Sequence, residues 1–171
     1  MKTSFARKTF LNGPGTCIQI LSLLITVLSG SITKAVDRID FESVESLVPL
    51  GPPGKVWTTS DGIQHIRDFA VSGPVSGDIN GTLTVIANIN WNLATGEGTA
   101  YGTFVLAVEW NGLTGTFVGR SQWKYSGFKV QDGQGVGHGT GDFEGMQLFA
   151  NFFDESGVTP LIGTILIPHS N

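Results

Sequence analysis

Residues 133–153, GQGVGHGTGDFEGMQLFANFF, decide the fold. The stretch begins as a glycine-studded run and ends in a hydrophobic strand over residues 146–153. Glycines inside a strand mark bends or places where another backbone approaches closely. We therefore predict that this stretch is a late, bent pair of strands, and that it closes a series of β-hairpins formed by the chain before it.

The clearest of these hairpins lies in residues 103–120, where Asn111-Gly112 separates two strands of alternating polarity. Asn-Gly in this position is the strongest short hairpin signal, because both residues of the favoured turn need positive φ. A two-residue loop sets the register of the strands. Leu106 is therefore expected opposite Phe117, on an apolar face where glycines oppose bulky side chains.

Two further segments have the pattern of antiparallel strands. Asp61-Gly62 is another two-residue turn signal, which would pair Trp57 with Ile66. In residues 79–92 apolar side chains alternate with threonine and asparagine. Such a period of two, with one polar face, indicates an antiparallel strand that covers a core.

The whole pattern predicts an all-β protein. No segment has the 3.6-residue period of a helix longer than about two turns. Seven or eight short strands at regular spacing are typical of a sandwich or a barrel. The 24 glycines favour a closed barrel, because glycines turn its corners and closure removes exposed edges. We expect a single antiparallel β-barrel of about eight strands over residues 55–169.

Residues 1–35 resemble a secretory signal peptide. Basic residues precede an apolar segment at residues 18–28, which is short for a bilayer span. Small residues follow, and Thr33-Lys34-Ala35 approximates a cleavage site, so we expect cleavage after Ala35. An uncleaved N-terminal anchor is the alternative. Export would make the mature protein secreted or periplasmic, with no stable membrane insertion after cleavage.

Residues 36–54 are expected to form an exposed N-terminal arm that links the signal peptide to the barrel. The segment is acidic at its start and carries Pro49, Pro52 and Pro53 at its end. Proline lacks a backbone donor and interrupts regular structure. We therefore assign no strand to this segment.

Charge and cysteine content exclude several classes of function. Four of the ten basic residues leave with the signal peptide, so six face fourteen acidic residues and the mature net charge is −8. An acidic chain without a basic cluster argues against binding to nucleic acid. Cys17 also lies in the signal peptide, so the mature chain has no thiol. The three histidines have no metal-ligand spacing, and we expect neither a metal nor a cofactor.

Residues 137–145, GHGTGDFEG, resemble the GGTG-x-F segment of dirigent proteins and allene oxide cyclases. They also resemble a GTGELAG-like segment of related bacterial barrels of unknown function. The pair Gly119-Arg120, followed by an aromatic strand, is a second feature that resembles this bacterial group. The resemblance covers residues 96–168. It implies an eight-stranded antiparallel barrel with an apolar pocket, often assembled as a homo-oligomer. No catalytic residue of these families can be aligned with this chain.

Four residues are candidates for ligand binding. Glu97, Tyr101 and Arg120 share one face of the predicted sheet. If that face lined the barrel, they could orient a polar head group or do acid–base work. The alternative is that it is the wet outer face, since the opposite face is the apolar one. His138 lies among glycines that let a ligand approach, and an exposed loop histidine is its alternative role.

Two functions follow from these observations. The first is a non-catalytic module that binds an apolar small molecule or has a structural role. The alternative is a cyclase- or isomerase-like enzyme acting on an apolar small molecule in the barrel pocket. The alternative needs converging titratable groups inside the barrel, which the sequence does not show, so we favour the first.

Overall fold

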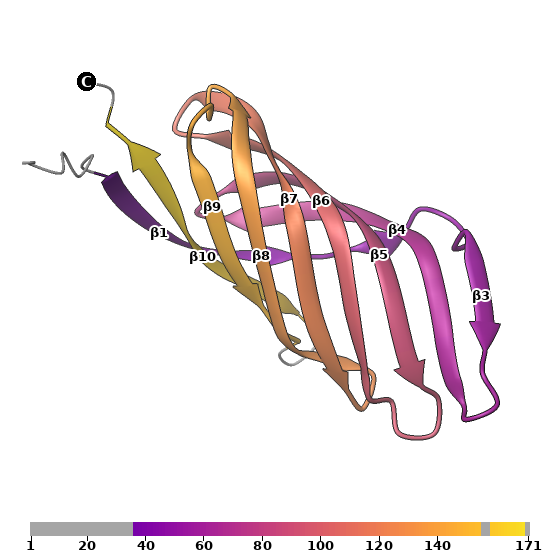
Figure 1. Ribbon diagram of the computed structural model, residues 1–171. Coiled ribbons are helices and arrows are strands. Elements are labelled where there is room, and N and C mark those ends of the chain that lie inside the picture. Colours follow the sequence, from indigo (N-terminus) through magenta and orange to yellow (C-terminus); the bar gives the residue numbers. More distant parts are fainter. Residues whose placement is uncertain (1–35, 155–157, 170–171) are drawn as a thin grey trace, which may run out of the picture. The chain divides into compact units, whose positions relative to one another are not determined.

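The computed structural model describes residues 36–154 and 158–169, within the compact unit Thr33–Asn171 (Figure 1). The expected signal peptide, residues 1–35, lies outside the described residues. The described residues form ten β-strands and no helix, so they contain no helix that could cross a membrane. The strands are β1 (Val36–Glu45), β2 (Val48–Pro49), β3 (Lys55–Thr58), β4 (Ile63–Gly77), β5 (Asn80–Asn92), β6 (Gly98–Trp110), β7 (Leu113–Ser126), β8 (Lys129–Gly141), β9 (Gln147–Phe152) and β10 (Thr159–Pro168).

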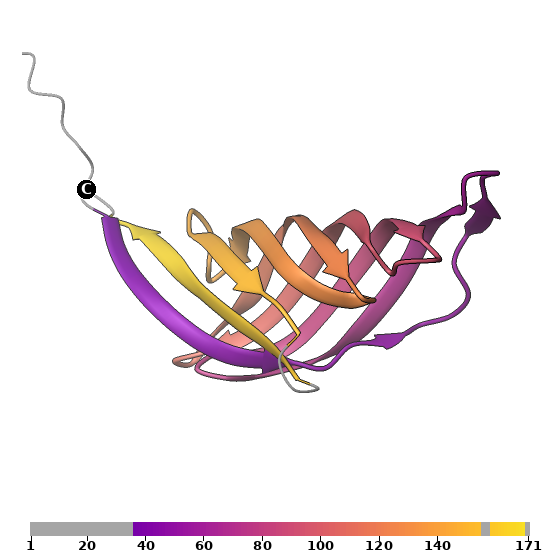
Figure 2. The same cartoon turned by 90° about the horizontal axis from the view of Figure 1, so that it is seen from below.

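The strands form one antiparallel sheet whose two ends meet. Neighbours follow the order β1-β10-β9-β8-β7-β6-β5-β4, and β1 then pairs with β4, so eight strands close into a ring. The closing contact joins residues 43–45 to residues 75–77. Figure 2 shows β1, in indigo, and β10, in yellow, side by side as they curve round toward β4. The strands β2 and β3 lie outside the ring, both paired with β4. The prediction of an all-β fold is confirmed.

β1 corrects our expectation of an exposed arm over residues 36–54. All ten residues of β1 pair with β10, and the last three also pair with β4. Phe41 and Ser43 point into the ring and are buried. Ser43 Oγ donates a hydrogen bond to the Ile79 carbonyl at 3.2 Å, which satisfies the buried hydroxyl. The ring therefore begins at β1, and only the later part of the expected arm, which contains β2 alone, runs outside it.

The register of the β6–β7 hairpin confirms the prediction from Asn111-Gly112. Both residues have positive φ, 53° and 78°, as a two-residue turn of this type requires. Leu106 lies opposite Phe117, and the pairing continues without interruption along both strands.

The β3–β4 hairpin differs from its prediction by one residue. Trp57 lies opposite His65, because the last pair is Thr58 with Gln64 and the five residues between them, 59–63, centre the turn on Asp61. Gly62 has positive φ but Asp61 does not, so the favoured two-residue turn does not form. The backbone N–H of Thr59 instead donates to the Ile63 carbonyl at 2.9 Å, which closes the longer loop.

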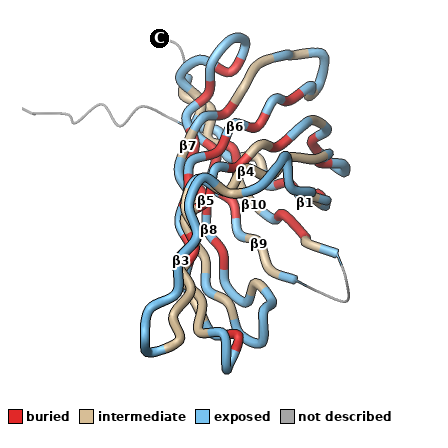
Figure 3. The backbone as a smooth tube through the Cα atoms, turned by 90° about the vertical axis from the view of Figure 1, so that its right-hand side faces the viewer, coloured by how far each residue is buried: buried red, intermediate tan, exposed pale blue. Residues whose placement is uncertain are grey.

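Buried and exposed residues alternate along most strands (Figure 3), as expected where successive side chains face the interior and the outside of the ring in turn. One end of the interior is packed solid beneath the β4–β5, β6–β7 and β8–β9 connections. Phe117 and Phe143 stack there with ring centroids 5.1 Å apart, and neither is exposed to solvent. Ile79 and Ile165 are equally buried. This end holds the hydrophobic core.

Strand β8 lines the interior with glycines instead of side chains. Gly133, Gly135, Gly137 and Gly139 are all buried and face inward. A Cβ on Gly139 would overlap the Phe143 carbonyl oxygen, so the β8–β9 turn packs directly on the backbone of β8. The expected late, bent pair of strands is confirmed as β8 and β9, which pair with each other.

Candidate functional site

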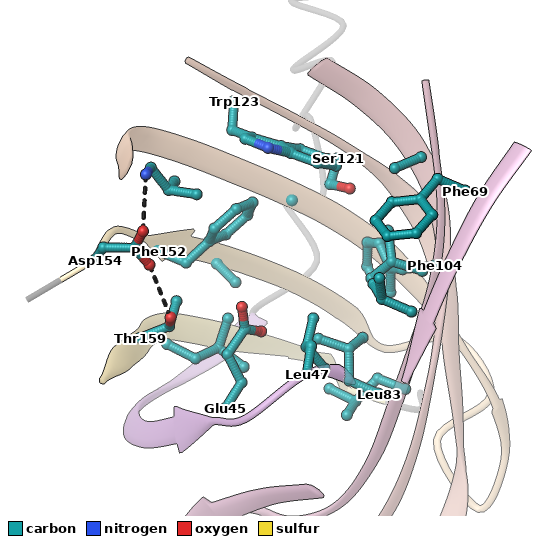
Figure 4. A pocket seen from close by; sticks show the side chains of 18 of the residues that line it. Glu45, Leu47, Phe69, Leu83, Phe104, Ser121, Trp123, Phe152, Asp154 and Thr159 are labelled. Atoms are coloured by element: carbon teal, nitrogen blue, oxygen red, sulfur yellow. Dashed lines mark hydrogen bonds between the residues drawn. The ribbon is translucent and has the colours of Figure 1, made fainter. Parts of the chain in front are cut away.

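The other end of the interior is a cavity of about 230 Å³. Figure 4 shows side chains from several strands of the ring converging on it. Most of the lining is apolar. It includes Leu83, Val85, Ala87 and Ile89 from β5, Phe104 and Leu106 from β6, Leu148 and Ala150 from β9, and Leu161 from β10. An apolar cavity with a few converging polar groups is the usual form of a small-molecule site.

The cavity exists partly because the inward-facing glycines of β8 contribute no side chain to it, and Val130 near the start of the strand is the β8 side chain that lines it. Gly135 lines the cavity. A Cβ there would make only ordinary contacts, at 3.4 Å from the edge of the Phe104 ring and at 3.9 Å from the Arg120 carbonyl oxygen and the Ser121 Cβ. At the neighbouring inward positions the space is taken, since a Cβ on Gly133 would overlap the Phe152 ring. Gly135 is therefore the position on β8 where a larger side chain would fill the cavity.

Two carboxylates lie at one side of the cavity. Glu45, at the end of β1, is half-buried and directs its carboxylate into the cavity (Figure 4). Asp154 follows β9 and is held in place by two donors. It accepts hydrogen bonds from the backbone N–H of Val130 at 2.9 Å and from Thr159 Oγ1 at 3.0 Å. Among the described residues, Glu45 accepts no such bond.

A hydroxyl and two large aromatic residues lie on the β7 side. Ser121 Oγ is buried, and no described residue donates to it or accepts from it. Trp123 and Tyr125 follow it at inward-facing positions of β7 and pack edge to face on each other, with ring centroids 6.4 Å apart. Burial raises the pKa of the Tyr125 phenol above its usual range, so this group stays protonated at neutral pH.

Glu45 has the most strongly altered acidity among these groups. Its burial in the cavity, and then the charge of Asp154, raise its pKa from 4.5 to about 7. Both causes disfavour the ionised carboxylate, the first by removing water and the second by repulsion. The side chain therefore changes its protonation state near neutral pH.

The raised pKa of Glu45 predicts that stability falls as the pH rises. Between about pH 4.5 and about pH 7 the folded protein binds the Glu45 proton and the unfolded chain releases it, so the free energy of unfolding decreases. Glu45→Gln removes this decrease. The full shift corresponds to about 3 kcal/mol, and water at the partly exposed carboxylate reduces it to about 1–2 kcal/mol.

Urea denaturation of both proteins near pH 5 and near pH 8 measures this effect. Glu42→Gln is the control, because Glu42 lies on the outward side of the same strand. From pH 5 to pH 8 we expect the free energy of unfolding to fall less in Glu45→Gln than in the wild type. In Glu42→Gln it should fall as much as in the wild type. A wild type that gains stability relative to Glu45→Gln over this range would contradict the assignment.

The four residues predicted from sequence do not line this cavity. Glu97, Tyr101, Arg120 and His138 are all exposed at the outer side of the ring. The face with Glu97, Tyr101 and Arg120 is therefore the outer one, which is the alternative given above, and ligand binding by these four residues stays a prediction. The pairing of β6 with both neighbours runs through Gly102 without a bulge, so no reversal of faces brings these side chains inward.

Tyr101, Arg120 and His138 occupy diagonal positions on three neighbouring strands, whereas Glu97 lies apart from them, and among the described residues no hydrogen bond or ion pair joins any two of the four. Glu97 lies in the β5–β6 connection and accepts a hydrogen bond from Ser126 Oγ at 2.8 Å. Tyr101, 54% exposed, borders a shallow polar hollow on the outer face. Arg120 lies opposite Val136. Among the described residues no three His, Cys, Asp or Glu side chains are arranged to hold a metal ion.

Sequence reasoning missed the residues that the cavity does bring together. A signal existed for Ser121, Trp123 and Tyr125, because the alternation of β7 places them on the side of Phe117. No local signal existed for Glu45 or for Asp154. The first lies in the segment expected to be an arm, and the second lies in a connection between strands.

These features define the class of protein: a closed ring of eight antiparallel strands, solid at one end and hollow at the other. No protein-family model matches the sequence, and the curated proteins contain no match. Among solved structures, the chain is similar to the crystal structure of a protein of unknown function from the DUF3224 family of Shewanella oneidensis MR-1. The TM-score is 0.61 at 13% identity, and the match covers 80% of this chain and 100% of that one. At this identity the similarity shows the fold alone.

Proposed function

We propose that this protein is an exported, non-catalytic β-barrel that binds an apolar small molecule in its interior. The observation that carries the proposal is the cavity of about 230 Å³, lined mainly by apolar side chains and left open by Gly135. Moving an apolar molecule from water into such a cavity is favourable in proportion to the apolar surface removed from water. A purely structural barrel would gain stability by filling this space.

We also propose that the barrel is related to the dirigent and allene oxide cyclase barrels. Two features support this relationship. The glycine segment of residues 137–145 leads into β9, and β10 then completes the ring beside β1, as the resemblance implies. The relationship supplies the fold and a pocket and leaves the ligand open.

Ligand binding in the cavity is tested by filling it. Gly135→Leu adds a side chain where the backbone has ordinary φ and a Cβ makes only ordinary contacts, and Val136→Leu adds one methylene on the outer face of the same strand. Octan-1-ol serves as the probe, and its binding is followed by intrinsic tryptophan fluorescence, because Trp123 lines the cavity. We expect Gly135→Leu to weaken binding by about tenfold or more, since the ligand and the leucine compete for one space. Val136→Leu should bind like the wild type.

Two results would overturn the proposal. If the wild type does not bind octan-1-ol, the cavity is not a site for apolar molecules. If Gly135→Leu binds as well as the wild type while keeping its melting temperature, the probe binds elsewhere. Native mass spectrometry of protein purified without detergent extends the test to the natural ligand, which should be retained as extra mass and lost on denaturation.

One observation favours a second candidate, a cyclase- or isomerase-like enzyme. Glu45 has a pKa of about 7 inside an apolar cavity, and general acid–base catalysts work best with a pKa near the operating pH. An isomerisation leaves the mass of the ligand unchanged. The released ligand should therefore be compared by chromatography before and after incubation with the wild type and with Glu45→Gln. Conversion by the wild type alone would establish the enzyme.

A further inference from the structure

We propose that the cavity takes an amphiphile with a protonated amine head group, with its apolar tail among the β5 and β6 side chains and its head against Glu45 and Asp154. The inference rests on the proposed function, and it adds the chemical class of the ligand. Three features of the cavity support it: the sign of its charges, the carboxylate oxygens at one side that no described donor occupies, and its volume.

The charges of the cavity are all of one sign. Glu45 and Asp154 are the carboxylates among the lining residues, and no lysine, arginine or histidine belongs to the described lining. A ligand with a carboxylate head would meet two negative charges and no positive one. A cation is favoured there, because ion pairs strengthen where water is partly excluded. The mature chain expected after cleavage is acidic as a whole, which also attracts cations.

The acceptors at this side of the cavity are left incomplete. Asp154 accepts two hydrogen bonds, which leaves half of its lone-pair positions, while Glu45 accepts none from the described residues. An ammonium group has three donors and no acceptor, so it complements two carboxylates. Its charge would also relieve the repulsion that contributes to the raised pKa of Glu45.

The volume sets the size of the tail. One water molecule takes about 30 Å³ of liquid, so 230 Å³ holds roughly eight non-hydrogen atoms of a ligand. An unbranched eight-carbon chain with one head atom is of this size. The lining residues Val85, Ala87 and Phe104 offer such a chain only apolar contacts.

Three probes with the same tail test the head group: octylamine, octan-1-ol and octanoate. Binding is measured by calorimetry near pH 8, where the amine is still protonated and Glu45 is mostly ionised. We expect octylamine to bind about tenfold more tightly than octan-1-ol, and octanoate to bind about tenfold more weakly. In Glu45→Gln the preference for the amine over the alcohol should fall to about threefold or less.

The outcomes separate this inference from the proposed function. If none of the three probes binds, the proposed function itself fails. If octan-1-ol binds and octylamine is no better, or octanoate is best, the cavity is a binding site but the amine head group is wrong. If the amine preference persists in Glu45→Gln, the head does not lie at Glu45. Glu42→Gln, which removes a charge outside the cavity, should keep the full preference.

Discussion

Replacing Gly139 with alanine is expected to lower the free energy of unfolding by about 3 kcal/mol, or to prevent folding. The added Cβ would overlap the carbonyl oxygen of Phe143, and the carbonyl cannot move freely. It belongs to a turn in which the Phe143 carbonyl accepts from the N–H of Met146, while Gly139 N–H donates to the Met146 carbonyl, both at 2.9 Å. Relief of the overlap would therefore break the β8–β9 connection.

The same strand supplies a graded series for this prediction. At Gly137 the Cβ would lie 2.9 Å from the Phe104 ring, which can tilt, so we expect a loss of about 1–2 kcal/mol. At Gly135 it would face the cavity, and alanine should be neutral or stabilise by up to about 1 kcal/mol, because it restricts the unfolded chain. Urea denaturation of the three variants gives the order. Equal losses at Gly135 and Gly139 would show that backbone freedom, and not space, explains these glycines.

Truncating Phe117 to alanine should cost about 3–5 kcal/mol. The side chain is fully buried and stacks on Phe143 at 5.1 Å, so its removal loses both the buried area and the aromatic pair. Phe149→Ala is the matched control, because Phe149 is 39% exposed on the outer face of β9. That change should cost about 1 kcal/mol or less.

The stacked pair can be separated from simple burial by a double-variant cycle. If Phe117 and Phe143 support each other, the loss from Phe117→Ala and Phe143→Ala together should be smaller than the sum of the two single losses, by about 0.5–1.5 kcal/mol. Strict additivity would mean that the two rings contribute independently. A loss at Phe117 no larger than the loss at Phe149 would contradict the assignment of the solid end as the stabilising core.

The local parts of the fold were predictable from sequence because their determinants are adjacent in the chain. Asn111-Gly112 fixes a two-residue turn, and every pair of the β6–β7 hairpin then follows. The same logic misplaced Trp57, because Asp61-Gly62 lies inside a longer loop that Thr59 closes. A turn signal gives the place of a turn, whereas its length depends on hydrogen bonds that the two central residues do not encode.

The cavity was less predictable because it is assembled from distant parts of the chain. Glu45 pairs with Thr159 on one side and with Val75 on the other. The polar sequence of β1 becomes a strand only when those partners are present, so the segment has the composition of an arm. Because the sequence did not predict β1 as a strand, it did not predict Glu45 as a site residue. The polar residues of the later strands were then proposed as the site.

The position of β1 between β4 and β10 has a consequence for the order of folding. Most neighbouring strands of the ring are also consecutive in the chain, so each such pair can form a hairpin as soon as its second strand has been synthesised. β1 is different, since its ten partners in β10 are separated from it by most of the chain. Pairings of such high sequence separation are slow to form, and the first strand stays an unprotected edge until the last one arrives.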